Sequence, residues 1–237
     1  MKKQSNIYAL IYAVVLVLVV GIVLSVIYQS LHPQQEENAA NDTKSQILRA
    51  ALISSDGKDV SALFDEHVNK AYIVDYHGNV VNNDPDAAFL ACMNMSNEIK
   101  QPQDKRKLPV FECTTDDGLK YVVPVYGAGL WGPIWGYIAF DKNGDTIYGA
   151  YFAHQGETPG LGAEIEKPAF SDQFKGKDIF SQRGKFMSVK VCKPGQEPKE
   201  GSYVNGVSGG TITSQGVDAM LRTSLAPYTE YLKKLGK

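Results

Sequence analysis

Residues 7–28, IYALIYAVVLVLVVGIVLSVIY, carry no charged side chain, and this stretch constrains the fold of the chain more than any other. A helix of about 20 apolar residues is long enough to span the hydrocarbon core of a bilayer. A cleavable signal peptide would have a shorter apolar stretch followed by a small-x-small site, whereas here the chain continues as QSLHP. The sequence therefore predicts an uncleaved transmembrane helix over residues 7–28.

The basic residues closest to this span precede it. Lys2 and Lys3 lie before the span, whereas residues 29–41 contain two glutamates and neither lysine nor arginine. Short flanking segments rich in Lys and Arg stay on the cytoplasmic side of a membrane. We therefore expect residues 1–6 in the cytoplasm and everything after the span outside it.

The rest of the chain divides into a tether and one domain. Residues 29–43 are polar, contain a proline and are predicted to be the tether, and residues 44–237 are numerous enough for one domain. Hairpins are predicted at residues 108–126 and 134–153, further strands at 70–81 and 185–192, and helices from 44 onward and at 60–68, 86–99 and 214–235. Strands grouped in antiparallel hairpins and flanked by helices indicate an α+β fold.

Composition excludes several classes of function. The chain has 24 basic and 26 acidic side chains, a net charge of −2 and no long block of Lys and Arg, so a nucleic-acid partner is not expected. Cys92, Cys113 and Cys192 lie far apart without a CxxC spacing, so neither a metal site nor a redox dithiol is expected. One disulfide with one free thiol, or three small buried side chains, both remain open.

The stretch 208–214, SGGTITS, joins two glycines to four hydroxyl side chains and lacks the lysine of a P-loop. Val217, Met220 and Leu221 then begin an apolar pattern at helical spacing, so the stretch lies just before a helix amino terminus. Free backbone N–H groups and the helix dipole attract anions there without a lysine. The alternative is a simple turn with Thr213 or Ser214 as the N-cap.

Two other stretches contain glycines beside polar or aromatic side chains. HQGETPGLGAEI at 154–165 has Glu157 and Thr158 as polar side chains and Leu161 as an apolar tip, and GAGLWGPIWGYIAFD at 127–141 contains Trp131 and Trp135. Taken alone, the first fits a surface turn and the second fits core packing. We expect His154 to be a structural hydrogen-bonding residue.

Together, these stretches resemble the FMN-binding domain family. NGVSGGTITSQGV at 205–217 resembles its flavinylation motif Dxx[ST]G[AG]T, in which FMN is joined through its phosphate to the last threonine; Asn205 stands here in place of the Asp. The resemblance implies that Thr211 carries covalent FMN beside Ser208, Gly209 and Gly210. It also implies a flavin pocket that contains Glu157, Thr158, Leu161, Gly162 and Trp131.

The single span and the GLWGPIWGY segment extend the resemblance to the C subunits of the sodium-translocating NADH:quinone oxidoreductases. This resemblance implies an electron-relay subunit of a bacterial inner-membrane complex, with a periplasmic domain, other subunits as partners and a flavin transferase that takes FMN from FAD. No residue is then expected to act as a catalytic acid or base, because the flavin supplies the redox chemistry. The alternatives are the equivalent subunit of a ferredoxin:NAD oxidoreductase complex and a membrane-anchored ligand-binding or scaffold domain.

Overall fold

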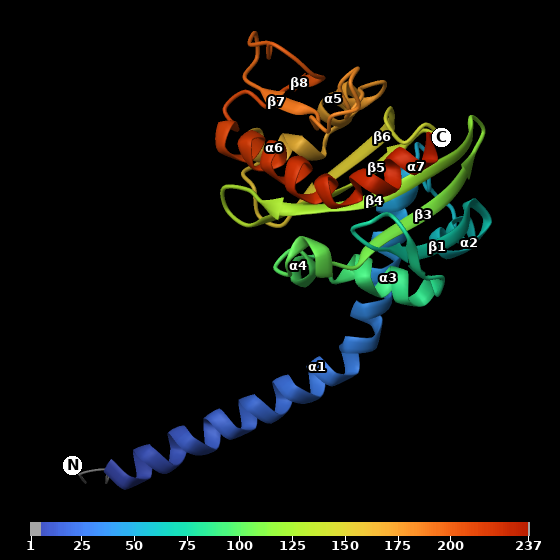
Figure 1. The fold of residues 1–237 in the computed structure, drawn as a ribbon. Coiled ribbons are helices and arrows are strands. Elements are labelled where there is room, and N and C mark those ends of the chain that lie inside the picture. The colour runs from blue at the N-terminus through green and yellow to red at the C-terminus, as the bar shows by residue number, and fades with distance from the viewer. Residues whose placement is uncertain (1–5, 237) are drawn as a thin grey trace. The chain divides into compact units, whose positions relative to one another are not determined.

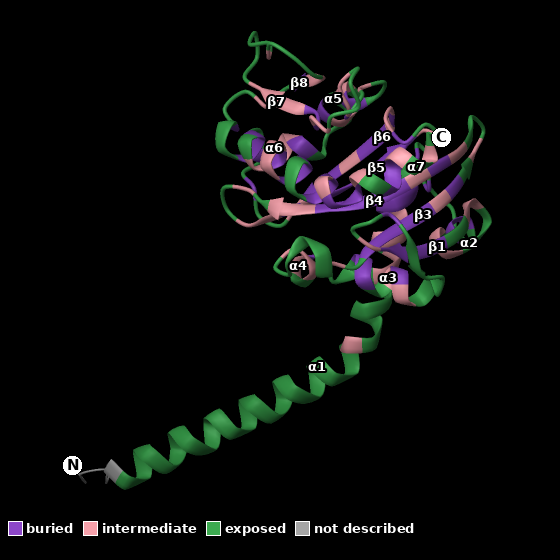
Figure 2. Cartoon of the chain, viewed as in Figure 1, coloured by how far each residue is buried: buried purple, intermediate pink, exposed green. Residues whose placement is uncertain are grey.

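The computed structural model describes residues 6–236, and the predicted cytoplasmic end with Lys2 and Lys3 lies almost entirely outside the described residues. The chain forms two compact units, one up to Asp42 and one from Thr43 onward. Helix α1 (Asn6–Ala50) supplies the first unit and the beginning of the second (Figure 1). Among the described residues it is the one helix long and apolar enough to cross a membrane: a stretch of 18 residues within it has a mean hydropathy of 3.2, and its large apolar side chains from Ile7 to Leu31 are exposed (Figure 2).

The segment predicted as a tether, residues 29–43, is helical and continues α1 without a break. Pro33 lies inside the helix, where it removes one backbone hydrogen bond. The residues after it are mostly Gln, Glu and Ala, which are strong helix formers and offset that loss. The tether is therefore not the irregular linker that its polarity and proline suggested, and its role as a tether stays a prediction.

The second unit contains a larger and a smaller sheet with helices around them. Its elements after α1 are α2 (Val60–His67), β1 (Val68–Val74), β2 (Val80–Asn82), α3 (Pro85–Met93), α4 (Met95–Glu98), η1 (Gln103–Lys105), β3 (Leu108–Thr115), β4 (Gly118–Ala128), β5 (Pro133–Phe140), β6 (Ile147–His154), η2 (Gly162–Glu166), α5 (Pro168–Ser171), η3 (Asp172–Phe174), β7 (Lys190–Cys192), β8 (Tyr203–Asn205), α6 (Thr211–Leu225), η4 (Ala226–Tyr228) and α7 (Thr229–Leu235).

The larger sheet has six strands in the order β2-β1-β3-β4-β5-β6, and all neighbours are antiparallel. Both predicted hairpins are present, as β3–β4 and β5–β6. The second turns as expected: Gly144 has a φ of +65°, and the Asn143 side-chain oxygen accepts hydrogen bonds from the N–H groups of Asp145 and Thr146. The α+β class is therefore confirmed.

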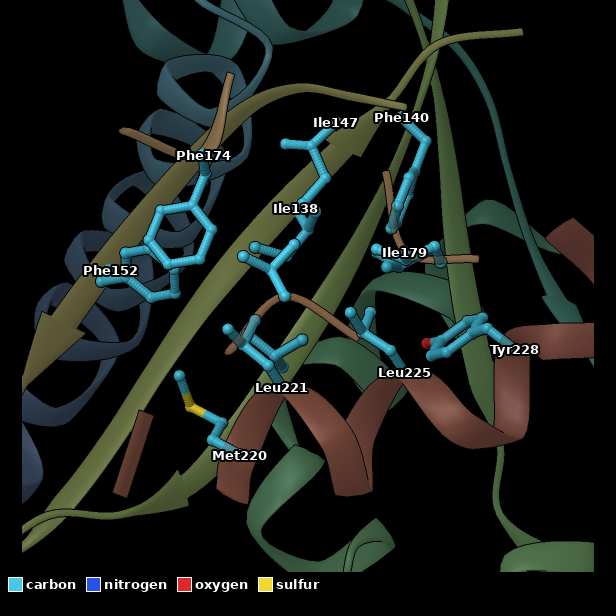
Figure 3. Packing of buried hydrophobic residues seen from close by; sticks show 14 of the residues in the cluster. Ile138, Phe140, Ile147, Phe152, Phe174, Ile179, Met220, Leu221, Leu225 and Tyr228 are labelled. Atoms are coloured by element: carbon cyan, nitrogen blue, oxygen red, sulfur yellow. The ribbon is translucent and has the colours of Figure 1, made fainter. Parts of the chain in front are cut away.

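Side chains alternate between the two faces of this sheet, as the pleat of a strand requires. On one face, Ile138 of β5 packs against Leu221 and Leu225 of α6 within a cluster that also contains Phe152 of β6 (Figure 3). On the other face, Tyr137 and Ala139 join a second cluster made with the end of α1, α2 and α3. Helices therefore cover both faces, and β5 is buried on both sides.

The predicted helix at 86–99 and the predicted strand at 185–192 differ in extent from the observed elements. The helix expected at 86–99 is divided at Asn94, whose side-chain amide donates to the Leu90 carbonyl at 2.9 Å and competes with the helical backbone. The strand expected at 185–192 is regular only over β7, because Ser188 just before it has a φ of +60°. β7 pairs in parallel with β8, a strand that the sequence pattern did not indicate.

The closing helix begins at Thr211, three residues earlier than predicted, and is interrupted by the short 3-10 turn η4 that contains Pro227. The proline accounts for this break, because it lacks the backbone N–H that a helix interior needs. α6 lies across the sheet, and its amino terminus follows directly from β8 and the SGGT loop (Figure 1).

Candidate functional site

The SGGT loop is a tight turn that leads into α6. The Gly210 N–H donates to the Val207 carbonyl at 3.1 Å, and Gly209, the third residue of this turn, has a φ of +77°. A type II turn requires a left-handed residue at this position, and glycine adopts that conformation without steric cost. The adjacent glycines therefore have different structural roles: Gly209 provides the positive φ of the turn, whereas Gly210 has a φ of −104° and is the N-cap of α6.

The N-cap prediction for Thr213 or Ser214 is wrong. Gly210 occupies the cap, and both hydroxyl residues lie inside the helix with buried side chains. The Ser214 hydroxyl accepts from the Val207 N–H at 2.9 Å and the Thr213 hydroxyl donates to Glu157 at 2.5 Å. These two hydroxyls are used in packing the loop and leave the helix terminus uncapped by a side chain.

Thr211 is the first residue of α6 and is exposed to solvent. Within residues 6–236, the backbone N–H groups of Thr211, Ile212 and Thr213 have no hydrogen-bond acceptor. Three free donors at the positive end of a helix of 15 residues form a site that favours an anion. The loop therefore combines an accessible hydroxyl with a place for a phosphate group, which fits the cofactor that the sequence implies.

Glu157 joins the three stretches that the sequence singled out. Its carboxylate accepts from the Trp131 N–H at 2.9 Å with one oxygen and from the Thr213 hydroxyl with the other. The side chain is only 5% exposed. The loop between β4 and β5, the loop after β6 and the amino terminus of α6 are therefore held together around one buried carboxylate.

The pKa of Glu157 lies below its ordinary value. Burial raises this pKa, but hydrogen bonds from Thr213 and from the backbone N–H groups of Trp131 and Leu130 lower it by more, and nearby His154 lowers it further. Glu157 is therefore ionised at neutral pH and accepts hydrogen bonds with both oxygens.

Close approach of the backbones around this carboxylate depends on glycine. A Cβ on Gly129 would lie 2.5 Å from a Glu157 oxygen, and one on Gly162 would lie 2.5 Å from the Thr213 hydroxyl. A Cβ on Gly209 would lie 2.5 Å from the end of the Leu161 side chain. Gly129, Gly162 and Gly209 thus lie where the stretches contact one another, which short-range turn signals do not reveal.

The same segments present apolar side chains to solvent. Trp131 is 69% exposed, Ile212 54%, Leu130 47% and Leu161 43%. Single exposed apolar residues are ordinary, but four on segments that meet at Glu157 mark a surface suited to a flat aromatic ligand or a partner. By contrast, Trp135 is partly buried, and its indole N–H donates to the Gln46 side chain at 2.9 Å.

The structure therefore brings together most of the predicted flavin residues. Ser208, Gly209, Gly210 and Thr211 form the loop, and Glu157, Leu161, Gly162 and Trp131 lie on segments in contact with it. Thr158 is exposed, and its carbonyl accepts from the N–H groups of Leu161 and Ala163 and so shapes the loop. His154 is a hydrogen-bonding residue as expected, since its Nδ1 accepts from the Glu157 N–H at 3.1 Å.

Sequence reasoning missed a groove on the other side of Thr211. The groove has a volume of about 280 Å³ and is lined by Thr211 together with Cys192 at the end of β7 and Lys193 and Gln196 from the segment that follows. The only available signal was the Lys-Pro pair after the predicted strand, which is common in ordinary turns. The SGGT loop contains no lysine, but the fold thus places Lys193 beside it.

All three cysteines are free thiols, and the described residues contain no cluster suited to a metal.

Comparison with known proteins agrees with this geometry. Residues 129–226 match the FMN-binding domain family. The C subunit of the Na(+)-translocating NADH-quinone reductase from Vibrio campbellii is 33% identical over 204 residues, which cover 79% of this chain and 78% of that protein. The same subunit from Vibrio vulnificus (strain YJ016) is 35% identical over 201 residues, with the same coverage.

Two solved structures share the fold. The C subunit of the reductase from Parabacteroides distasonis has a TM-score of 0.76 and 44% identity, covering 85% of this chain and 96% of that one. The Shewanella oneidensis protein NqrC has a TM-score of 0.66 and 28% identity, covering 84% of this chain and 98% of that one. The relatives named here belong to the quinone reductase and not to the ferredoxin-dependent complex. The chain therefore belongs to the family of C subunits of the Na(+)-translocating NADH-quinone reductase, an oxidoreductase complex, and carries its FMN-binding domain.

Proposed function

We propose that Thr211 carries FMN as a phosphoester and that the domain relays electrons within the membrane oxidoreductase complex. The observation that carries this proposal is an exposed hydroxyl placed among three free N–H groups at a helix amino terminus. When bound, FMN accepts and passes on electrons, and the chain contributes its position and electrostatic surroundings. No side chain needs to act as an acid or base in the electron transfer itself.

Attachment needs an enzyme, because a threonine hydroxyl is a poor nucleophile unless a base activates it. The Thr211 hydroxyl displaces AMP at the FMN phosphorus of FAD: one P–O bond to Thr211 forms, the diphosphate bond breaks, and the hydroxyl proton passes to a base of a flavin transferase. The ester keeps one negative charge, which the free N–H groups at the start of α6 stabilise. Lys193, which lines the same groove, adds a positive charge nearby.

The four exposed apolar side chains supply a surface for the flavin ring: Ile212 lies on α6, and the other three come from segments held to α6 through Glu157. Gly209 and Gly210 allow the backbone to approach the phosphate closely. We further propose that the domain lies on the periplasmic side of the inner membrane, in contact with other subunits of the complex, because the basic residues closest to the span precede it.

The test is the mass of the intact protein made in a host with a flavin transferase. The wild type should be heavier by one FMN minus one water, and Thr211→Val should lose this mass completely while it stays folded. Ser208→Ala is the matched control, because it removes an exposed hydroxyl of the same loop and should keep the added mass. Covalent flavin in Thr211→Val would show that another residue is the attachment site, and a folded, flavin-free wild type would refute the relay function.

A further inference from the structure

Glu157 is the one buried carboxylate among the described residues, and it is used differently from what its place in the flavin-facing loop implied. Its oxygens are engaged by donors from two other segments, Trp131 and Thr213. A carboxylate that already accepts these bonds has little capacity left for a ligand. We therefore expect Glu157 to hold the neighbouring segments in place and not to contact a ligand itself.

The segment that Glu157 holds is the loop between β4 and β5. This loop is short, since the Gly129 N–H donates to the Gly132 carbonyl at 2.8 Å, and its tip consists of the exposed Leu130 and Trp131. Apart from this internal bond, the tip is held by its N–H groups on the Glu157 carboxylate. Thr213, the other partner of Glu157, lies two residues after Thr211, so the tip is tied to the start of α6 by two hydrogen bonds in series.

We propose that Glu157 is a positioning residue of the flavin site: it holds Leu130 and Trp131 in place relative to Thr211 and thereby restrains the flavin ring. This inference rests on the proposed attachment of FMN at Thr211. It also explains why a carboxylate stands here, because both partners are donors and two acceptor oxygens are required. A glutamine can replace it in part, since its oxygen accepts from Trp131 while its amide donates to the Thr213 hydroxyl.

The test compares Glu157→Ala, Glu157→Gln and Lys120→Met in the full chain, made with a flavin transferase and purified in detergent. Lys120 is buried in β4 and donates to Asp141 at 2.6 Å, so its replacement destabilises the same domain without touching the Glu157 hydrogen bonds. Three quantities are measured: the covalent FMN mass, the visible circular dichroism of the flavin, which reports restraint of its ring, and the melting temperature.

We expect Glu157→Ala to retain covalent FMN but to lose at least half of the flavin dichroism. Glu157→Gln should keep most of that signal. Lys120→Met should lower the melting temperature and leave the dichroism unchanged. If Glu157→Ala does not fold, Thr213→Val, which removes only the hydroxyl donor, should show the same loss in weaker form.

Several results would overturn the inference. Unchanged dichroism in Glu157→Ala would show that the loop tip keeps its position without the hydrogen bonds to Glu157. An equal loss of dichroism in Lys120→Met would show that Glu157 contributes only to the stability of the domain. A Glu157→Gln variant as impaired as Glu157→Ala would assign the effect to charge. Wild-type protein without flavin would instead refute the proposed function, so the two failures are distinguishable.

Discussion

Adjacent glycines in the SGGT loop should respond differently to the same substitution. Gly209 has a φ of +77°, whereas Gly210 has a φ of −104°, a value open to any residue. An L-residue in the left-handed region costs about 1–2 kcal/mol, and this cost applies to Gly209→Ala alone. Both substitutions also reduce the entropy of the unfolded chain by the same amount, about 0.4–1 kcal/mol, so that contribution cancels when the two variants are compared.

Steric contacts do not reverse this order. A Cβ at Gly210 would lie 3.2 Å from the Val207 side chain and 3.3 Å from the Gly162 Cα, and each contact requires a shift of a few tenths of an ångström. A Cβ at Gly209 would lie 2.5 Å from the tip of Leu161, an exposed side chain that can rotate away, although its displacement disturbs the apolar surface. We therefore expect Gly209→Ala to be about 1–2 kcal/mol less stable than Gly210→Ala.

The assay is thermal unfolding of the full chain in detergent, followed by far-ultraviolet circular dichroism, together with the covalent FMN mass. For a domain of this size, 1 kcal/mol corresponds to about 2–4 °C, so Gly209→Ala should melt about 2–8 °C below Gly210→Ala. Gly210→Ala should keep its flavin. Equal melting temperatures, or a lower one for Gly210→Ala, would refute the assignment of the left-handed conformation to Gly209.

Three further predictions concern reactivity, acid and topology. Burial raises the pKa of the Cys92 and Cys113 thiols to about 12, so an alkylating reagent at pH 8 should modify only Cys192 in the folded protein and all three after unfolding, as counted by mass. The pKa of Glu157 is lowered on folding, so its ionisation stabilises the protein above its ordinary pKa, and this contribution is lost as the pH falls through the lowered pKa. The melting-temperature advantage of wild type over Glu157→Gln should therefore shrink as the pH falls from 6 to 3. A reporter active only in the cytoplasm, fused after Lys237, should be silent, and clear activity would reverse the proposed orientation.

The sequence by itself determined the features that depend on local rules. A long apolar run forms a helix because lipid offers the backbone no hydrogen bonds. The turn at Asn143-Gly144 between two β-rich runs specifies a hairpin, because glycine adopts the positive φ that the turn requires. The position of Thr211 after Ser-Gly-Gly came from a motif, and the structure places this residue exposed at the start of α6.

Tertiary structure decided what depends on residues far apart in the chain. The bond between Glu157 and Thr213 joins residues 56 positions apart, and it takes Thr213 away from the capping role that its local sequence favours. Lys193 reaches the groove of Thr211 only because β7 pairs in parallel with β8. Local propensity differs between conformers by about 1 kcal/mol or less per residue, whereas satisfying a buried carboxylate is worth more, so the packed arrangement prevails over the local preference.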